Sequence, residues 1–401
     1  MGTEFKAIIS GTVTSPQGFL AGAVKAGIKG EEKLDLAILC SEKPCVAAGV
    51  FTATTIKAAP VILSRKHLKD GKAQAIVVNA GCANACTGDS GMADAVEMVA
   101  SVADKQGLPA EDVLVASTGV IGVPLPMELV RSGISRIVLT KDGGHDLARA
   151  MMTTDTFPKE MAVCVESELG GFTVAGVAKG AGMIHPNMAT MLCFLTTDAM
   201  VEARFLQLAL KKAVDASFNM ITVDGDTSPS DTVVILANGL AQTKTVNKSN
   251  GEPFQKALDE VCLYLAKCLA RDGEGATKLI EVVVEGAVDI AQARMATRTV
   301  ASSPLFKAAI HGNDPNWGRV VAALGRSGAR LDERKLEVYL NGVCVMNQGC
   351  PVLFDKQQAS AGLAVKEVSV RLCLNLGQGK AVAWGCDLSG EYVTINSTYT
   401  S

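Results

Sequence analysis

Short apolar runs of strand length alternate with helical hydrophobic patterns along the whole chain, and this alternation restricts the fold more than any other feature. Apolar residues recur with helical spacing in 92–105 and 256–270. The first helix should present one apolar face, formed by Ala95, Val96, Val99 and Val102. Strand-length runs lie at 74–79, 172–178, 277–285, 335–340 and 367–375. The interleaving predicts an α/β or α+β protein, and 401 residues exceed one ordinary core, so we expect about two or three domains.

Two segments allow a more detailed expectation. In 367–375 apolar and polar residues alternate, which is typical of a half-buried antiparallel strand. The segment 243–253 is polar and rich in turn-forming residues, so we interpret it as an exposed loop.

The charge balance excludes several classes of partner. The chain carries 38 basic and 41 acidic residues, a net charge of −3, without long runs of one sign. Nucleic acid and anionic membrane surfaces attract basic patches, so we expect neither as a partner. No apolar stretch approaches the ~18 uncharged residues of a membrane span.

The twelve cysteines are dispersed. None form a CxxC pair, and neither Cys82 with Cys86 nor Cys344 with Cys350 has a histidine nearby. We therefore expect no structural zinc and a reducing compartment. The N-terminus lacks the features of a secretory signal. The cytoplasm fits, as does a chloroplast or mitochondrial matrix if a presequence has been removed.

The segment from Lys179 to Leu192 carries the strongest functional signal. A glycine-rich run leads to Ala189-Thr190, and an apolar run follows. This layout fits a chain that cleaves itself before Thr190 and then uses the new N-terminal threonine as a nucleophile, with the freed α-amine as its base. The alternative is an Ala-Thr pair that is simply part of a strand.

Two further segments offer groups that could bind a ligand. Thr118-Gly119 follows an apolar run, so a hydroxyl and a backbone N–H would lie side by side at a strand end, as in an anion site. Glu274 lies between two glycines, which allow the backbone to approach a ligand closely. The alternatives are a strand-to-turn junction and the stop of a helix.

Two other polar features have simpler explanations. Asp224-Gly225-Asp226 suggests a metal site, but the Ser-Pro-Ser run that follows favours a turn. His185 precedes a proline in a loop and is interpreted as a local hydrogen-bonding residue.

Taken together, the chain resembles the ornithine acetyltransferases (glutamate N-acetyltransferases) of the cyclic arginine pathway from Gly22 to its end. The segments that carry the resemblance are 79–88, 117–122, 152–156, 179–192, 223–227, 272–278, 311–319 and 395–401. Each is moderately specific alone, and their combination in this order is very specific.

The resemblance implies an acetyl transfer by a ping-pong mechanism. The precursor would cleave itself between Ala189 and Thr190, giving an α chain of 1–189 and a β chain of 190–401. Thr190 would take the acetyl group from N2-acetyl-L-ornithine and pass it to L-glutamate, while Thr118 and Gly119 stabilise the oxyanion. Some members also accept acetyl-CoA as donor, and the sequence leaves this open.

The resemblance also implies the residues that bind substrate, which are Thr156, Lys179, Thr190, Glu274, Asn396 and Ser401. Lys179 suits an α-carboxylate, and Glu274 suits the cationic end of ornithine. No cofactor and no metal are implied. Because Asn396 and Ser401 lie near the chain end, the C-terminus must fold back into the site.

The implied fold consists of stacked α-β-β-α layers, like the N-terminal-nucleophile hydrolases but with a different topology. The α and β chains should remain intertwined and form an α2β2 assembly. One alternative is a self-processing amidohydrolase or aminopeptidase of the same fold, although its peptidase branch uses serine. A non-enzymatic binding protein is the other alternative, and it would not need Thr190, Thr118 and Lys179 together.

Overall fold

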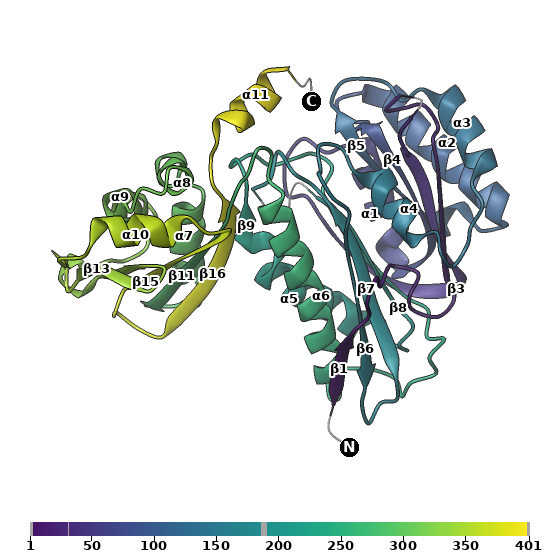
Figure 1. The fold of residues 1–401 in the computed structure, drawn as a ribbon. Helices are drawn as coiled ribbons and strands as arrows, with labels where there is room; N and C mark the ends of the chain where they lie inside the picture. Colours follow the sequence, from purple (N-terminus) through teal and green to yellow (C-terminus); the bar gives the residue numbers. More distant parts are fainter. Residues whose placement is uncertain (1–2, 31, 186–190, 399–401) are drawn as a thin grey trace.

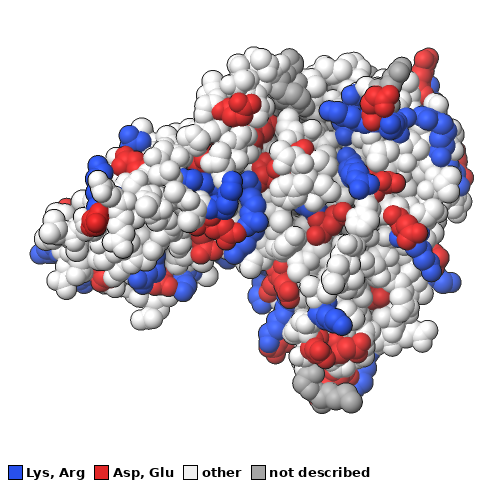
Figure 2. Space-filling model, in the orientation of Figure 1, with Lys and Arg blue, Asp and Glu red and all other residues white. Residues whose placement is uncertain are grey.

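The chain forms two sheets with helices packed around them, and the two sheets lie in different lobes (Figure 1). The computed structural model describes residues 3–30, 32–185 and 191–398. Within these ranges, every helix is too short or too polar to cross a membrane. Basic and acidic side chains are interspersed over the face shown in Figure 2, without a large area of one sign.

The larger sheet has the strand order β1-β6-β7-β8-β10-β3-β4-β5, with β2 paired to β3. Its strands are β1 Glu4–Ala7, β2 Phe19–Val24, β3 Leu36–Phe51, β4 Lys72–Cys82, β5 Val113–Val120, β6 Lys159–Glu166, β7 Phe172–Lys179, β8 Leu192–Thr197 and β10 Thr232–Ala237. The accompanying helices are α1 Ala59–His67, α2 Gly88–Gln106, α3 Met127–Arg136, α4 Gly144–Met151, α5 Ala203–Ala216 and α6 Glu252–Arg271.

Strand alternation divides this lobe into layers. In β4, Ile76 and Val78 join Phe194 of β8 and Leu236 of β10 in one buried cluster, to which α4 also contributes. The opposite faces of these strands pack against helices, with β4 under α1, α2 and α3, and β8 under α5 and α6. Two halves of the sheet thus face each other between two helical layers, because successive side chains of a strand point to opposite sides. This confirms the expected α/β class and its α-β-β-α layers.

The smaller sheet has the order β14-β13-β12-β15-β11-β16-β9. Its strands are β9 Ile221–Thr222, β11 Leu279–Ala287, β12 Glu337–Leu340, β13 Val343–Asn347, β14 Cys350–Pro351, β15 Glu367–Cys373 and β16 Gly379–Cys386. The helices that follow α6 are α7 Ile290–Ala301, α8 Pro304–His311, α9 Trp317–Gly325, α10 Lys356–Leu363 and α11 Gly390–Thr398. Short 3-10 helices are η1 Leu68–Asp70, η2 Ala110–Asp112, η3 Phe218–Met220 and η4 Glu333–Lys335.

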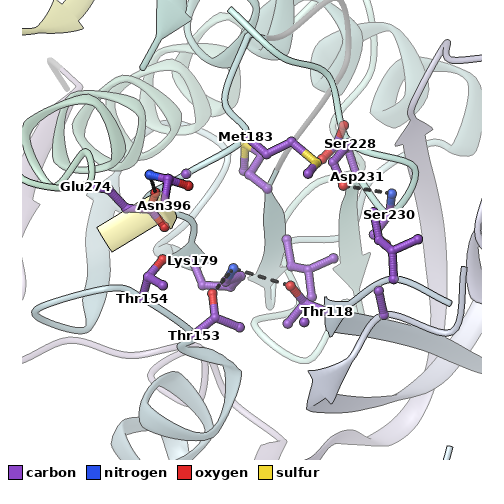
Figure 3. Close-up of a pocket in the computed structure, with 16 residues that line it drawn as sticks. Thr118, Thr153, Thr154, Lys179, Met183, Ser228, Ser230, Asp231, Glu274 and Asn396 are labelled. Atoms are coloured by element: carbon purple, nitrogen blue, oxygen red, sulfur yellow. Dashed lines mark hydrogen bonds between the residues drawn. The ribbon is translucent and has the colours of Figure 1, made fainter. Parts of the chain in front are cut away.

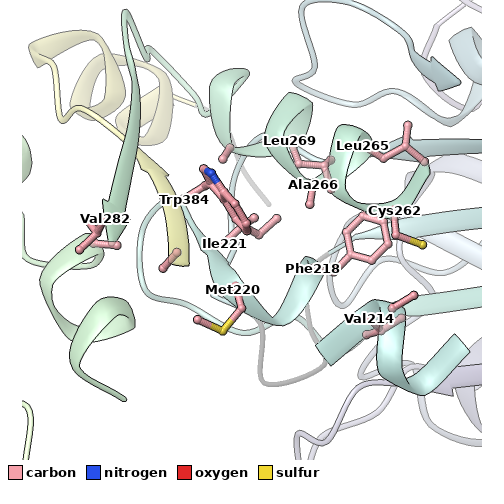
Figure 4. Packing of buried hydrophobic residues seen from close by; sticks show 14 of the residues in the cluster. Val214, Phe218, Met220, Ile221, Cys262, Leu265, Ala266, Leu269, Val282 and Trp384 are labelled. Carbon is pink, nitrogen blue, oxygen red and sulfur yellow. The ribbon is translucent and has the colours of Figure 1, made fainter. Parts of the chain in front are cut away.

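Helix α6 joins the two lobes into one hydrophobic core. Leu265 and Leu269 of α6 approach Ile221 of β9 and Trp384 of β16, and all four belong to the same buried cluster (Figure 4). Because α6 also packs on β6 and β7, the lobes cannot separate without exposing apolar surface.

The helices at 92–105 and 256–270 are confirmed as α2 and α6, and each expected strand is present. Three details expected from the sequence were wrong. Val96 is 49% exposed, because α2 buries a narrower face. Strand β15 is antiparallel to β12 but parallel to β11. Val246 is buried and bridges Val201, and α6 already begins at Glu252, so 243–253 is not simply an exposed loop.

Candidate active site

A pocket lies where β5, β7 and the start of β8 meet the segment between α6 and β11 (Figure 3). It encloses about 700 Å³ including its open mouth. Its lining residues are Ala83, Thr118, Gly119, Ile121, Thr153, Thr154, Lys179, Gly182, Met183, Met191, Leu192, Ser228, Ser230, Asp231, Glu274 and Asn396. Ala189, Thr190 and Ser401 lie outside the described residues. Met191, which directly follows Thr190 in the sequence, lines the pocket.

Thr118 and Gly119 stand at the end of β5, where two strands approach unusually closely. Gly119 is paired with Gly81 of β4 and has a φ of 126°. A Cβ on Gly119 would lie 2.3 Å from the Gly81 carbonyl carbon, so only glycine fits this position. The glycine pair therefore fixes the backbone at Thr118 and Gly119, which both line the pocket.

Lys179 is the last residue of β7, and its ammonium group lies at the pocket wall. Its Nζ donates to Thr153 Oγ1 at 2.8 Å and to Thr118 Oγ1 at 3.3 Å. Because the Thr118 oxygen accepts this bond, its own hydrogen remains available to a third group. Burial lowers the pKa of Lys179, and nearby Asp155 opposes this shift.

Behind Lys179 lies a buried network of charges that the sequence did not reveal. Lys159 Nζ is 2.6 Å from Asp155 Oδ1 and 2.6 Å from Asp272 Oδ2, and all three side chains are almost inaccessible. Asp155 also accepts from the Gly180 N–H at 2.6 Å. Burial raises the pKa of Asp155, but Lys179, Lys159 and the hydrogen bonds together lower it to about 2. Asp155 therefore remains ionised and fixes the backbone at Gly180, the residue that follows Lys179.

Glu274 reaches the pocket between α6 and β11. Its carboxylate accepts from Asn396 Nδ2 at 2.8 Å, so α11 folds back over the site as expected for the C-terminus. Gly182 gives the carboxylate its room, because a Cβ there would lie 2.5 Å from the Glu274 carboxyl group.

Thr156 does not line the pocket with the other expected residues. The residue is exposed overall, but both its hydroxyl and its backbone N–H donate to Asp272. In this conformation Thr156 supports the buried charge network.

Asp231 is an unexpected residue of the pocket. It directly precedes β10, whose parallel register with β8 places it beside Met191. It is 3% exposed, and neither carboxylate oxygen has a hydrogen-bond partner of good geometry among the described residues. Burial raises its pKa well above the ordinary value, although the Met191 backbone, Lys179 and Thr52 act in the opposite direction. The sequence offered one signal, an aspartate where a polar run meets the apolar strand at 233–237.

The family model described as the ArgJ family matches residues 20–401. The chain belongs to the ArgJ family. The resemblance drawn from the motifs is thereby confirmed.

Three ArgJ relatives illustrate the match. The arginine biosynthesis bifunctional protein ArgJ of Dehalococcoides mccartyi is 54% identical over 98% of both chains. Its counterpart in Symbiobacterium thermophilum is 51% identical over 98% of this chain and 99% of the relative. A solved structure of ArgJ from Bacillus halodurans is 42% identical, with a TM-score of 0.50 over 51% of this chain and 97% of the solved one.

Two polar features of this ArgJ-family chain stabilise the loop that precedes the expected cleavage point. Asp224 accepts from the backbone N–H groups of Met183 at 2.6 Å and Ile184 at 2.9 Å. It also accepts from the Asp226 N–H at 3.2 Å, and this local bond supports the turn interpretation. His185 Nδ1 lies 3.0 Å from Thr222 Oγ1 and Nε2 lies 3.2 Å from Arg298 Nη2. Burial and Arg298 lower the pKa of His185 to about 4, so it is a neutral hydrogen-bonding residue at pH 7.

Proposed function

We propose that this ArgJ-family protein transfers the acetyl group of N2-acetyl-L-ornithine to L-glutamate, in arginine biosynthesis. The observation that carries the proposal is the convergence of Thr118, Gly119, Lys179 and Glu274 on one pocket that also contains Met191. These residues come from both sides of the Ala189-Thr190 bond.

The first step in this proposal is self-cleavage. The Thr190 hydroxyl attacks the Ala189 carbonyl carbon, and the peptide bond becomes an ester. Water then opens the ester, which leaves a carboxylate on Ala189 and a free α-amine on Thr190. Thr118 and Gly119 are the proposed donors to the oxyanion.

The second step transfers the acetyl group. The α-amine of Thr190 accepts the proton of its own hydroxyl as the oxygen attacks the acetamide carbon, and the proton then goes to the departing ornithine amine. The α-amine of glutamate then attacks the carbonyl carbon of the acetyl-threonine ester. The bond from that carbon to the Thr190 oxygen breaks, a proton from the glutamate amine returns to this oxygen, and N-acetyl-L-glutamate leaves. Each oxyanion donor stabilises the transition state by roughly 3 kcal/mol.

Charge complementarity supports the choice of substrates. The ammonium of Lys179 can pair with an α-carboxylate, and the carboxylate of Glu274 can pair with the cationic end of ornithine. Thr156, Asn396 and Ser401 complete the proposed binding set. The reaction needs neither a cofactor nor a metal.

Two measurements test the proposal. The intact mass of the denatured protein should show two polypeptides, one starting at Thr190, that together equal the 41.6 kDa chain plus one water. Acetyl transfer from acetylornithine to glutamate should then greatly exceed hydrolysis. A single uncut species with no activity would overturn the proposal, and dominant hydrolysis would favour the amidohydrolase alternative.

Three finer proposals accompany the reaction. The relatives are named bifunctional, and we propose that a second activity of this chain uses acetyl-CoA as acetyl donor. Two α and two β chains would form an α2β2 assembly of twice 41.6 kDa, which light scattering can measure. The cytoplasm is the proposed compartment, because these relatives come from bacteria.

A further inference from the structure

A second hollow opens beside the loop that carries the active-site pocket. It lies along α7, between His185 and the residue that follows α9, Arg326. Its open space is about 1100 Å³, including solvent at the mouth. We name it the arginine groove, because Arg294, Arg298 and Arg326 line it.

The arginine groove gathers three positively charged side chains. Among the residues that line it, none is Asp or Glu. Within the described part of the chain, Arg294 and Arg326 form no ion pair, whereas Arg131 and Arg271 each face a glutamate. Arg294 and Arg298 are also four residues apart on α7, where like charges destabilise a helix. An anion in the groove would remove this repulsion.

The groove lies next to the active-site pocket. Gly182 and Met183 line the pocket, and His185 of the same segment lines the groove. Arg298 contacts His185, and Ile184 forms a bridge to Thr227, so the segment is held where it reaches the groove. Only Ile184 separates Met183, which lines the pocket, from His185, which lines the groove, so a ligand with a long arm can be anchored in the groove and extend towards the pocket.

We propose that the arginine groove binds the phosphate groups of a coenzyme A thioester, the second acetyl donor. This inference rests on the proposed function. Guanidinium groups form paired hydrogen bonds with phosphate oxygens, and several arginines suit a ligand with several phosphates. Coenzyme A carries a 3′-phosphate and a pyrophosphate at one end and the thioester at the end of a long arm.

The other substrates do not fit this groove. The cationic side chain of ornithine would be repelled by three arginines. Glutamate offers carboxylates, which arginine also binds, but it carries fewer negative charges than the phosphates of coenzyme A. Inorganic phosphate or a regulatory nucleotide shares the phosphate chemistry, so the experiment must separate these sources from coenzyme A.

The test compares the double variant Arg294→Gln/Arg326→Gln with the cleaved wild-type protein. The KM for acetyl-CoA in acetylglutamate synthesis should rise about tenfold or more, which corresponds to ~1.4 kcal/mol. The KM for acetylornithine should stay within about twofold, because the loss is confined to the phosphate contacts. Arg330→Gln changes an exposed arginine outside the groove and should alter neither KM.

A binding measurement keeps the test independent of activity. Titration calorimetry of the wild type with coenzyme A, 3′,5′-ADP and pyrophosphate should give heat for the first two, and the double variant should lose it. Binding of pyrophosphate alone would overturn the coenzyme A assignment. Equal binding of coenzyme A by the wild type and the double variant would show that the arginine groove is not its binding site. Failure of acetylornithine transfer in the wild type would instead contradict the proposed function.

Discussion

At the residue scale, two glycines determine the shape of the pocket. Gly119 lets β5 approach β4, and Gly182 leaves space for the carboxylate of Glu274. Both positions belong to motifs that resemble the acetyltransferase family, and the structure gives a steric reason for glycine at each. A methyl group at either site would displace a group that we assign to the reaction.

Gly119→Ala should impair the oxyanion site. The added methyl would overlap the Gly81 backbone. In addition, the φ of 126° at position 119 is unfavourable for any residue with a Cβ. We expect a loss of kcat of about a hundredfold or more, similar to removal of one oxyanion donor. The measurement is kcat for acetylornithine together with the extent of self-cleavage.

Gly122→Ala is the matched control for that variant. Gly122 also has a positive φ, but a Cβ there would meet no atom within 4 Å. Gly122→Ala should therefore lower stability by roughly 1 kcal/mol, through backbone strain alone, with little change in kcat. Equal kcat losses in the two variants would contradict the steric argument.

Asp231 should make stability depend on pH. Its pKa is raised in the folded protein, so the folded state retains a proton that the unfolded chain releases above about pH 4. Stability therefore falls as pH rises from the unfolded pKa towards the folded one. Asp231→Asn removes this titration, so its stability relative to wild type should increase as pH rises, by ~1.4 kcal/mol for each unit of pKa difference.

Thermal unfolding of Asp231→Asn and wild type over a range of pH would check this. Asp142→Asn changes an exposed carboxylate in a turn and serves as control. Parallel pH curves for Asp231→Asn and wild type would show that Asp231 is already ionised in the folded protein.

At the element scale, one buried lysine connects β6, the turn before it and the end of α6. Lys159 pairs with Asp155 of the turn and with Asp272, the residue that follows α6. Asp155 also accepts a hydrogen bond from the Gly180 N–H, directly after β7, and Asp272 accepts one from the Thr156 N–H. The position of Lys179 therefore depends on contacts that lie behind the pocket.

Lys159→Met should destabilise the protein strongly, because two buried carboxylates would lose their common partner. The expected cost is roughly 3–5 kcal/mol, as for other buried pairs from which one partner is removed. Lys179 should also lose its fixed position. The KM for acetylornithine should therefore rise in the fraction of the variant that folds.

The exposed pair of Lys211 and Asp215 on α5 provides the control for Lys159. Lys211 is 65% exposed and lies 2.7 Å from Asp215. Lys211→Met should change stability by only about 0.3–0.5 kcal/mol. Comparable denaturation midpoints for the two variants would mean that the buried network contributes little.

At the scale of the whole molecule, the two expected chains are interleaved in one sheet. Strands β8 and β10, which follow Thr190, lie between β7 and β3, which precede it. Hydrogen bonds therefore join the α and β chains on both sides of the β8–β10 pair. Cleavage between Ala189 and Thr190 would leave these contacts intact.

The cleaved chains should remain together without a covalent link. An affinity tag at the N-terminus should retain the chain that begins at Thr190 through extensive washing, because separation would break two strand pairings and open a common core. In denaturant the same tag should retain only the α chain. Loss of the untagged chain under native conditions would contradict the interleaved arrangement.

The sequence by itself determined the family, the location of the cleavage motif and several helices and strands. These depend on residue type and local spacing: glycine where the backbone needs positive φ, a small residue before threonine, and apolar residues at helical or strand period. Only the tertiary structure decided the ion pairs of Lys159, the burial of the Asp231 carboxylate and the arginine groove. Each joins residues from distant segments, and such contacts depend on strand register and helix packing, which no local pattern records.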